Sequence, residues 1–230
     1  MKLWSRFLDA LYPAGCACPL CGREAVLGLE GVCPGCLPLP LVTEPLPCPP
    51  DLDGLAAGLV YTGTVENAVK RFKYQRQVWL APFLAGFIQL PPDWRIDCIL
   101  PVPLHFFRQW QRTFNQSELL SVQLGRRCSL PVRVDLLRRV RYTSPQARLS
   151  AHRRRDNLTG AFRASPGVKG LSLLLVDDVT TTHATLTECA RALKSAGAAR
   201  VYAATVCVAG RDGTRDGTLR QDSLAKPGIP

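Results

Sequence analysis

One stretch of the chain joins an apolar run, a polar turn and an amphipathic segment. Residues 171–176 form the near-continuous apolar run that is typical of a parallel strand buried on both faces. Further on, apolar residues recur at the spacing of one helix face: Leu186, Cys189, Ala190 and Leu193. Gly197 then stands where a helix usually ends. The pattern predicts a strand, a loop and a helix, in that order.

The same patterning predicts elements earlier in the chain. Strands are expected at 55–61 and 96–102, and helices at 66–74, 78–90 and from Asn115 to about residue 126. At the start, apolar residues at helical spacing favour a short amphipathic helix: Trp4, Phe7, Leu8 and Leu11. Six prolines in 37–50 exclude a helix there, so this segment is expected to be an extended linker.

Two acidic residues and a threonine-rich turn connect the predicted strand at 171–176 to its helix. Asp177 and Asp178 come at the carboxyl end of the strand, where open α/β sheets bind ligands. The turn opens a helix whose free N–H groups favour an anion. A ribose 5-phosphate, with neighbouring hydroxyls beside a phosphate, would satisfy both halves of such a site. The alternative is that the two aspartates only cap a buried strand and helix.

The sequence VDDVTTTHAT in this stretch resembles the core of the type I phosphoribosyltransferase signature. In that family the acidic pair holds the ribose 2- and 3-hydroxyls, and the turn holds the 5-phosphate. The resemblance therefore implies that Asp177 and Asp178 bind ribose. The residues that it implies for the phosphate are Thr181, Thr182, His183, Ala184 and Thr185. The family usually has glycine where His183 stands, and glycine there permits close backbone approach.

Four of the ten cysteines form two C-x2-C pairs, separated by eleven residues: Cys18, Cys21, Cys33 and Cys36. Four thiolates in this arrangement suit tetrahedral Zn²⁺, with iron or a metal-free reduced form as alternatives. The start of the chain does not have a secretory pattern, which predicts a cytoplasmic protein with reduced thiols. Cys16 lies close enough in the sequence to compete as a ligand, and Cys48 follows in the proline-rich segment, but neither belongs to the predicted set of four. The others are predicted to be small core residues: Cys98, Cys128, Cys189 and Cys207.

The composition fits one main folded domain, and the charge is concentrated in one region. The chain is 47% hydrophobic, and it has no run of the ~18 apolar residues that a membrane helix needs. Of the net charge of +11, nearly all lies in 106–155, which has twelve arginines against Glu118 and Asp135. Such a region attracts phosphates on a metabolite, a nucleic acid or a phospholipid surface, or it is simply a solvated basic face.

Two further stretches, together with the cysteine pairs, resemble the ComF family of ComFC and GntX-like proteins. The first runs from Pro101-Val102-Pro103-Leu104 through arginines to Phe114-Asn115-Gln116. The second runs from Arg141-Tyr142-Thr143-Ser144-Pro145-Gln146 to Ala161-Phe162, with an arginine run at 153–155 between them. Thr113 departs from the family, which has glycine there.

The ComF resemblance implies an α/β protein in which a small zinc ribbon precedes a type I phosphoribosyltransferase-like parallel sheet with flanking helices. It implies a pyrophosphate loop after the 96–102 strand and a closing loop at 141–150. The expected organisation is an N-terminal amphipathic helix at 1–15, a zinc ribbon and proline-rich linker at 16–50, the phosphoribosyltransferase-like domain at 51–210 and a disordered tail at 211–230.

Three functional hypotheses follow from the resemblance. The first is a protein of DNA uptake in natural transformation that binds phosphoribosyl pyrophosphate with Mg²⁺, single-stranded DNA and proteins of the uptake machinery. Aromatic residues near the arginines could stack bases or belong to the core: Phe106, Phe107, Trp110 and Phe114. The second is an active phosphoribosyltransferase, for which the sequence identifies neither an acceptor nor a catalytic residue. The third is a scaffold whose phosphate turn has degenerated at His183.

Overall fold

The structure is a computed structural model that describes residues 17–104, 114–141 and 158–210. The expected N-terminal helix and tail lie outside these residues. So do most of the predicted pyrophosphate and closing loops, with Thr113 and three of the four candidate stacking aromatics. Within the described ranges, none of the helices is both long and apolar enough to cross a lipid bilayer.

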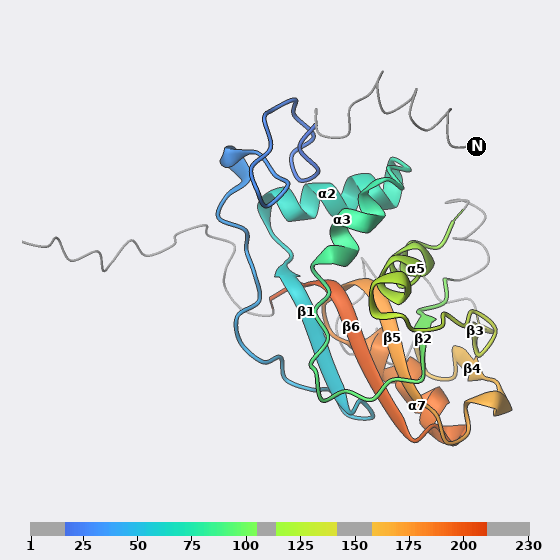
Figure 1. Cartoon of the computed structure of the whole chain (residues 1–230). Helices are drawn as coiled ribbons and strands as arrows, with labels where there is room; N and C mark the ends of the chain where they lie inside the picture. Colours follow the sequence, from blue (N-terminus) through green and yellow to red (C-terminus); the bar gives the residue numbers. More distant parts are fainter. Residues whose placement is uncertain (1–16, 105–113, 142–157, 211–230) are drawn as a thin grey trace, which may run out of the picture.

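A four-stranded parallel sheet forms the centre of the molecule (Figure 1). Its strands are β1 (Gly54–Val60), β2 (Cys98–Pro101), β5 (Ser172–Thr180) and β6 (Arg200–Val208), in the spatial order β1-β6-β5-β2. The predicted parallel sheet with flanking helices is therefore confirmed. The carboxyl ends of β5 and β2 lie side by side, with Pro101 opposite Val176.

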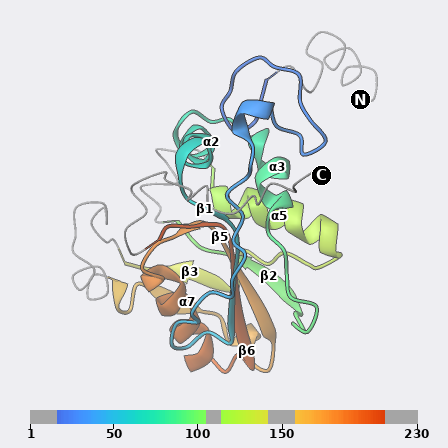
Figure 2. The ribbon, with the colours of Figure 1, turned by 90° about the vertical axis from the view of Figure 1, so that its left-hand side faces the viewer.

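Helices cover both faces of this sheet (Figures 1 and 2). The core on one face contains α2 (Gly63–Tyr74), α3 (Leu80–Gly86) and α5 (Gln116–Cys128). The core on the other face contains α7 (Ala184–Ser195) and the antiparallel pair β3 (Leu137–Arg139) and β4 (Phe162–Ala164). Short 3-10 turns lie at Pro34–Cys36 and Pro166–Val168.

The pleat of β5 assigns its side chains to these two cores. Leu174 and Val176 pack with α2, α3 and α5, whereas Leu173 and Leu175 pack with α7. Successive side chains of a strand point to opposite faces, so this alternation is expected. The same alternation, continued from Val176 to Asp178, turns the side chain of Asp178 toward the face that carries α2.

Most predicted elements are present, with altered bounds. The predicted strands and helices at 55–61, 66–74 and 115–126 correspond to β1, α2 and α5, while α3 and β2 are shorter than expected. The strand expected at 171–176 is longer: β5 continues through both aspartates to Thr180. The helix at its end is α7, and Gly197 beyond it has the positive φ of 94° typical of a helix stop.

The segment with the cysteine pairs packs directly on the helices above the sheet. Leu20 and Val32 are fully buried in the same core as Phe72 of α2 and Leu84 of α3. Arg71 of α2 donates hydrogen bonds to the carbonyl oxygens of Pro19 and Leu20. The two parts of the chain therefore share one core.

The proline-rich segment 37–50 is extended, and it runs along the outer edge of β1 (Figure 2). Val42 N donates to Gly58 O at 3.0 Å, and Val60 N donates to Pro40 O at 2.7 Å. These bonds cover an edge that would otherwise expose unpaired backbone groups. The segment therefore does not hold the cysteine pairs apart from the body, as a free linker would.

Candidate functional site

The two aspartates of β5 lie next to each other but have different partners. Asp177 Oδ1 accepts a hydrogen bond from Ser117 Oγ of α5 at 2.8 Å. Asp178 is 7% exposed, and its Oδ1 lies 2.8 Å from Lys73 Nζ of α2. Neighbouring helices therefore hold both carboxylates at the carboxyl end of the sheet.

The surroundings of the acidic pair shift two pKa values. Burial, and then the Asp178 carboxylate, raise the pKa of Asp177 to about 7. Burial acts to lower the pKa of Lys73, but the Asp178 carboxylate outweighs it and the pKa of Lys73 is raised. Near neutral pH the pair is therefore close to a change of charge at Asp177.

The turn after β5 leads into α7 through a left-handed residue. His183 precedes the first helical residue with φ 56° and ψ 2°, a conformation that glycine adopts without strain. The imidazole folds back, with Nδ1 2.8 Å from Thr180 Oγ1. The turn thus keeps a glycine-like backbone although the side chain is larger.

A cavity of about 70 Å³ lies in this turn, lined by Asp177, Val179 and residues 180–186. It includes all seven predicted ligand residues except Asp178: Asp177, Thr181, Thr182, His183, Ala184 and Thr185. The volume exceeds the ~15 Å³ that one water needs, so a larger polar group has room. The first N–H groups of α7 have no partner within the helix, and together with its dipole they favour an anion here.

Three consecutive side chains at the start of α5 connect the elements of this site. Asn115 caps the helix by accepting from Ser117 N at 3.1 Å, and its Nδ2 donates to Val102 O after β2 at 3.2 Å. Gln116 Nε2 donates to Lys73 O at the end of α2 at 3.2 Å, and Ser117 binds Asp177. The predicted helix start at Asn115 is confirmed. Its wider role in joining α2, β2 and β5 had no signal in the sequence.

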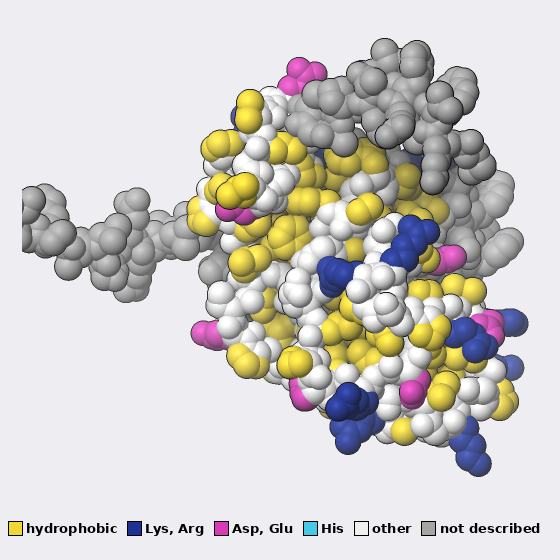
Figure 3. Space-filling model, viewed as in Figure 1, with side chains coloured by type: hydrophobic (Ala, Val, Ile, Leu, Met, Phe, Trp, Pro, Cys, Tyr) yellow, Lys and Arg dark blue, Asp and Glu magenta, His cyan; other side chains and the backbone are white. Residues whose placement is uncertain are grey.

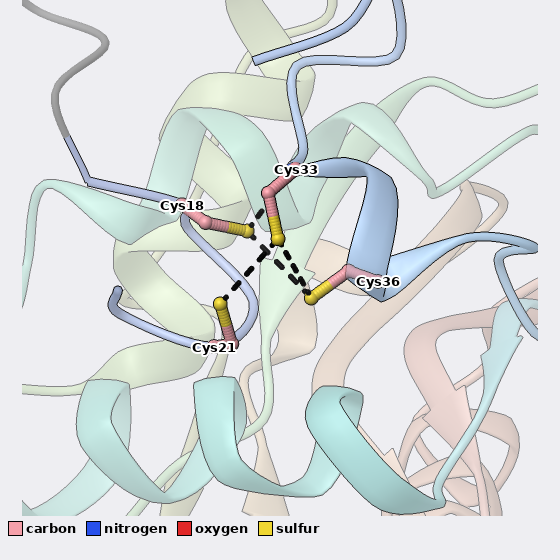
Figure 4. A group of neighbouring side chains, drawn as sticks. All are labelled: Cys18, Cys21, Cys33 and Cys36. Carbon is pink, nitrogen blue, oxygen red and sulfur yellow. Dashed lines mark hydrogen bonds between the residues drawn. The ribbon is translucent and has the colours of Figure 1, made fainter. Parts of the chain in front are cut away.

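The four paired cysteines form a second candidate site (Figure 4). The Sγ atoms of Cys18, Cys21, Cys33 and Cys36 all lie within 4.8 Å of one another, with separations of 3.7 Å for Cys18–Cys36, 3.7 Å for Cys21–Cys33 and 3.6 Å for Cys33–Cys36. Four sulfurs at ~2.3 Å from a tetrahedral zinc are about 3.8 Å apart, so the cluster fits Zn²⁺. These separations are too long for disulfide bonds.

The charge state of Cys21 also suits a metal ligand. Burial acts to raise the pKa of this thiol, but hydrogen bonds with Arg23 outweigh it and lower the pKa to about 6. Of the cysteines predicted for the core, Cys98, Cys189 and Cys207 are buried and Cys128 is half-buried. Cys48 is exposed, and Cys16 lies outside the described residues.

Two basic residues of α2 and one aromatic residue make contacts inside the protein. Arg71 has a partly buried contact with the cysteine segment, and Lys73 has one with Asp178. Phe114 packs against Phe72, with ring centroids 6.3 Å apart, which supports its core alternative. The arginine-rich region is described only in part, since six of its twelve arginines lie outside the described residues.

The chain is similar to a known domain family, to curated proteins and to solved structures. A family model of the phosphoribosyl transferase domain matches residues 117–226. DNA utilization protein YhgH of Salmonella typhimurium is 35% identical over 209 residues, which cover 83% of this chain and 89% of that protein. Competence protein F of Haemophilus influenzae is 36% identical over 153 residues, covering 60% of this chain and 65% of that protein. Among solved structures, a glutamine phosphoribosylpyrophosphate amidotransferase from B. subtilis overlaps with 56% of this chain and 25% of its own, at 18% identity and a TM-score of 0.36.

The parallel sheet and the family match define a protein of the phosphoribosyltransferase fold. The four-cysteine cluster adds a candidate metal centre near its N-terminus. The chain belongs to the ComF family, as its similarity to YhgH and Competence protein F over most of its length shows.

Proposed function

We propose that this chain is a phosphoribosyltransferase-fold protein of DNA uptake that binds phosphoribosyl pyrophosphate and single-stranded DNA. The names of its relatives, DNA utilization protein and Competence protein F, support the role in DNA uptake. Binding of phosphoribosyl pyrophosphate is supported by one observation: Asp177, the 180–186 turn and the start of α7 surround one cavity. Asp177 and Asp178 accept hydrogen bonds from the pentose hydroxyls. The turn and the first N–H groups of α7 hold the 5-phosphate.

Two ions belong to this proposal. Cys18, Cys21, Cys33 and Cys36 would hold Zn²⁺, which would stabilise the N-terminal segment. Mg²⁺ bound together with the ligand would offset the charge of its pyrophosphate. The chain's own residues bind and orient the pentose phosphate.

The backbone of the turn keeps the conformation that a glycine would adopt most readily. His183 has a left-handed φ of 56°, which costs a residue with a side chain roughly 1–2 kcal/mol. In this conformation the turn lines the proposed phosphate cavity.

Isothermal titration calorimetry with phosphoribosyl pyrophosphate and MgCl₂ tests the ligand. We expect saturable binding to the native chain and a loss of at least about tenfold in affinity for Asp177→Asn combined with Asp178→Asn. Asp97→Asn is the matched control, because Asp97 accepts a backbone N–H at the opposite end of the same strand, from Ser172 at 2.7 Å. Equal binding by the double variant would contradict this site, and no binding by the native chain would contradict the ligand.

Fluorescence anisotropy with labelled single-stranded DNA at several salt concentrations tests the nucleic acid. We expect that charge reversal of the arginines at 153–155 weakens binding and lowers the slope of log affinity against log salt by about 0.7 for each lost phosphate contact. Charge reversal of Arg95, an exposed residue before β2, serves as the control outside the arginine-rich region. An unchanged slope in the 153–155 variant would contradict the role of this run.

A further inference from the structure

Lys73 is a mostly buried cation beside the proposed pentose site. It lies in the last turn of α2, its side chain is 18% exposed, and Nζ is 2.8 Å from Asp178 Oδ1. Burying a lysine costs side-chain entropy and hydration, so such a residue needs a compensating partner. The Asp178 carboxylate, whose side chain is 9% exposed, is that partner.

The neighbouring lysine on the same helix shows how unusual this position is. Lys70 lies about one turn earlier, is 55% exposed, and pairs with Glu66 of its own helix at 2.6 Å. Such an exposed pair within one helix contributes little to stability. Lys73 instead reaches across to another element and to an acid of the proposed site.

The backbone that carries Lys73 is also held in place. Gln116, which is 1% exposed, donates from Nε2 to Lys73 O. The next residue, Ser117, donates to Asp177 Oδ1. The start of α5 therefore sets the distance between Lys73 and the acidic pair.

We propose that Lys73 is a positioning residue for ligand binding: its ammonium fixes Asp178 through Oδ1 and so orients Oδ2 toward a pentose hydroxyl. This inference rests on the proposed function and assigns a role to a residue outside the family signature. Side chains alternate between the two faces of the sheet along β5, and this alternation turns Asp178 toward α2. Without a counter-ion on that side, its carboxylate could rotate. The lysine removes this freedom before the ligand arrives, which lowers the entropy that binding would otherwise cost.

Calorimetry on the full chain, with phosphoribosyl pyrophosphate and MgCl₂, tests this role through a double-mutant cycle. The proteins are the native chain, Lys73→Met, Asp178→Asn and the double variant, with Lys70→Met as the matched control. We expect Lys73→Met and Asp178→Asn each to weaken binding about tenfold. We expect the double variant to bind no more weakly than Asp178→Asn alone, because Lys73 acts through Asp178.

Each other outcome overturns a defined part of the proposal. If native and Lys73→Met chains bind equally, Lys73 serves stability only, and a lower melting temperature without an affinity change would show this. If the double variant is about tenfold weaker than Asp178→Asn, Lys73 contacts the ligand directly. If the native chain does not bind, the proposed function fails and this inference fails with it.

The double-mutant cycle remains informative even if the Lys73→Met variant does not fold. Lys73→Met leaves a buried carboxylate without its counter-ion, which destabilises a fold. The double variant removes both charges, so the comparison of Asp178→Asn with the double variant remains measurable. Circular dichroism of each variant confirms that the chains under comparison are folded.

Discussion

At the scale of single residues, Asp177 and Asp178 differ in the groups that hold their carboxylates. Asp178 is held by a counter-ion, whereas Asp177 accepts a hydrogen bond from a neutral hydroxyl and lies beside another carboxylate. Two adjacent carboxylates, one half-buried and one buried, repel each other, and one cation cannot neutralise both. The difference in partners therefore makes Asp177 the group whose charge responds to pH.

The raised pKa of Asp177 predicts a specific dependence of stability on pH. Its pKa of about 7 in the folded chain lies above the ~3.9 of an unfolded aspartate, so the folded chain binds more protons between these values. Its contribution to the free energy of unfolding therefore falls as pH rises from about 4 to about 7. We expect Asp177→Asn to remove this loss. From pH 5 to pH 8, the free energy of unfolding of the variant should therefore rise by about 1–3 kcal/mol relative to that of the native chain.

Chemical denaturation at both pH values measures this effect. Asp135→Asn is the control, because hydrogen bonding to Arg133 lowers the pKa of Asp135 to about 2 and it does not titrate in this range. If the native chain and Asp177→Asn lose stability in parallel between pH 5 and pH 8, then Asp177 does not titrate there.

At the scale of elements, the start of α5 is the junction of the site. Its first three side chains bind the loop after β2, the end of α2 and the end of β5. A helix N-terminus normally needs one capping side chain, and Asn115 supplies it while also satisfying a carbonyl on another element. Movement of α5 would therefore displace Lys73 and Asp177 together.

Asn115→Ala tests this junction. We expect it to lower the free energy of unfolding by about 1–3 kcal/mol, since both the cap and the bond to Val102 O are lost. We expect it also to weaken binding of phosphoribosyl pyrophosphate, although Asn115 does not line the turn. Arg126→Ala, at an exposed position of the same helix, should change stability by less than about 0.5 kcal/mol. Equal effects of the two variants in urea unfolding would argue against a junction at Asn115.

The elements also show what sequence patterning can and cannot predict here. Burial on both faces makes β5 an apolar run, and an asparagine before a helix marks the start of α5, so both features were predictable. Residues 201–207 have the same apolar signal and form most of β6, although this strand is not among the elements predicted above. The partnership of Lys73 with Asp178 was not predictable, because it depends on how α2 and β5 pack, and periodicity along one element does not contain that information.

At the scale of the whole molecule, basic side chains do not cover the described surface evenly. On the face in Figure 3, Lys and Arg side chains of the described residues lie in small groups among apolar and acidic ones. The described part of this face therefore lacks a continuous basic surface. The proposed charge reversal targets 153–155 because the sequence concentrates its arginines in 106–155.

The shared core ties the candidate zinc centre to the site on the sheet. The cysteine segment buries Leu20 and Val32 against α2 and α3, and Arg71 joins it to α2 two residues before Lys73. Metal sites of this type supply folding free energy directly, because the ligands are not preorganised in the unfolded chain. Loss of the ion should therefore loosen α2 as well as the cysteine segment.

Hydrogen exchange after removal of zinc with a chelator measures this coupling element by element. We expect faster exchange of the amides of 63–74 in the zinc-free chain, whereas amides of α7, which packs in the other core, change little. Arg71→Ala should reduce the difference between zinc-bound and zinc-free α2, because it removes the bonds to Pro19 O and Leu20 O. If exchange in α2 is the same with and without zinc, the metal centre stabilises only its own segment. If α2 does respond, loss of the ion also loosens the helix that carries Lys73. The zinc-free chain, freed of chelator and returned to MgCl₂, should then also bind phosphoribosyl pyrophosphate more weakly.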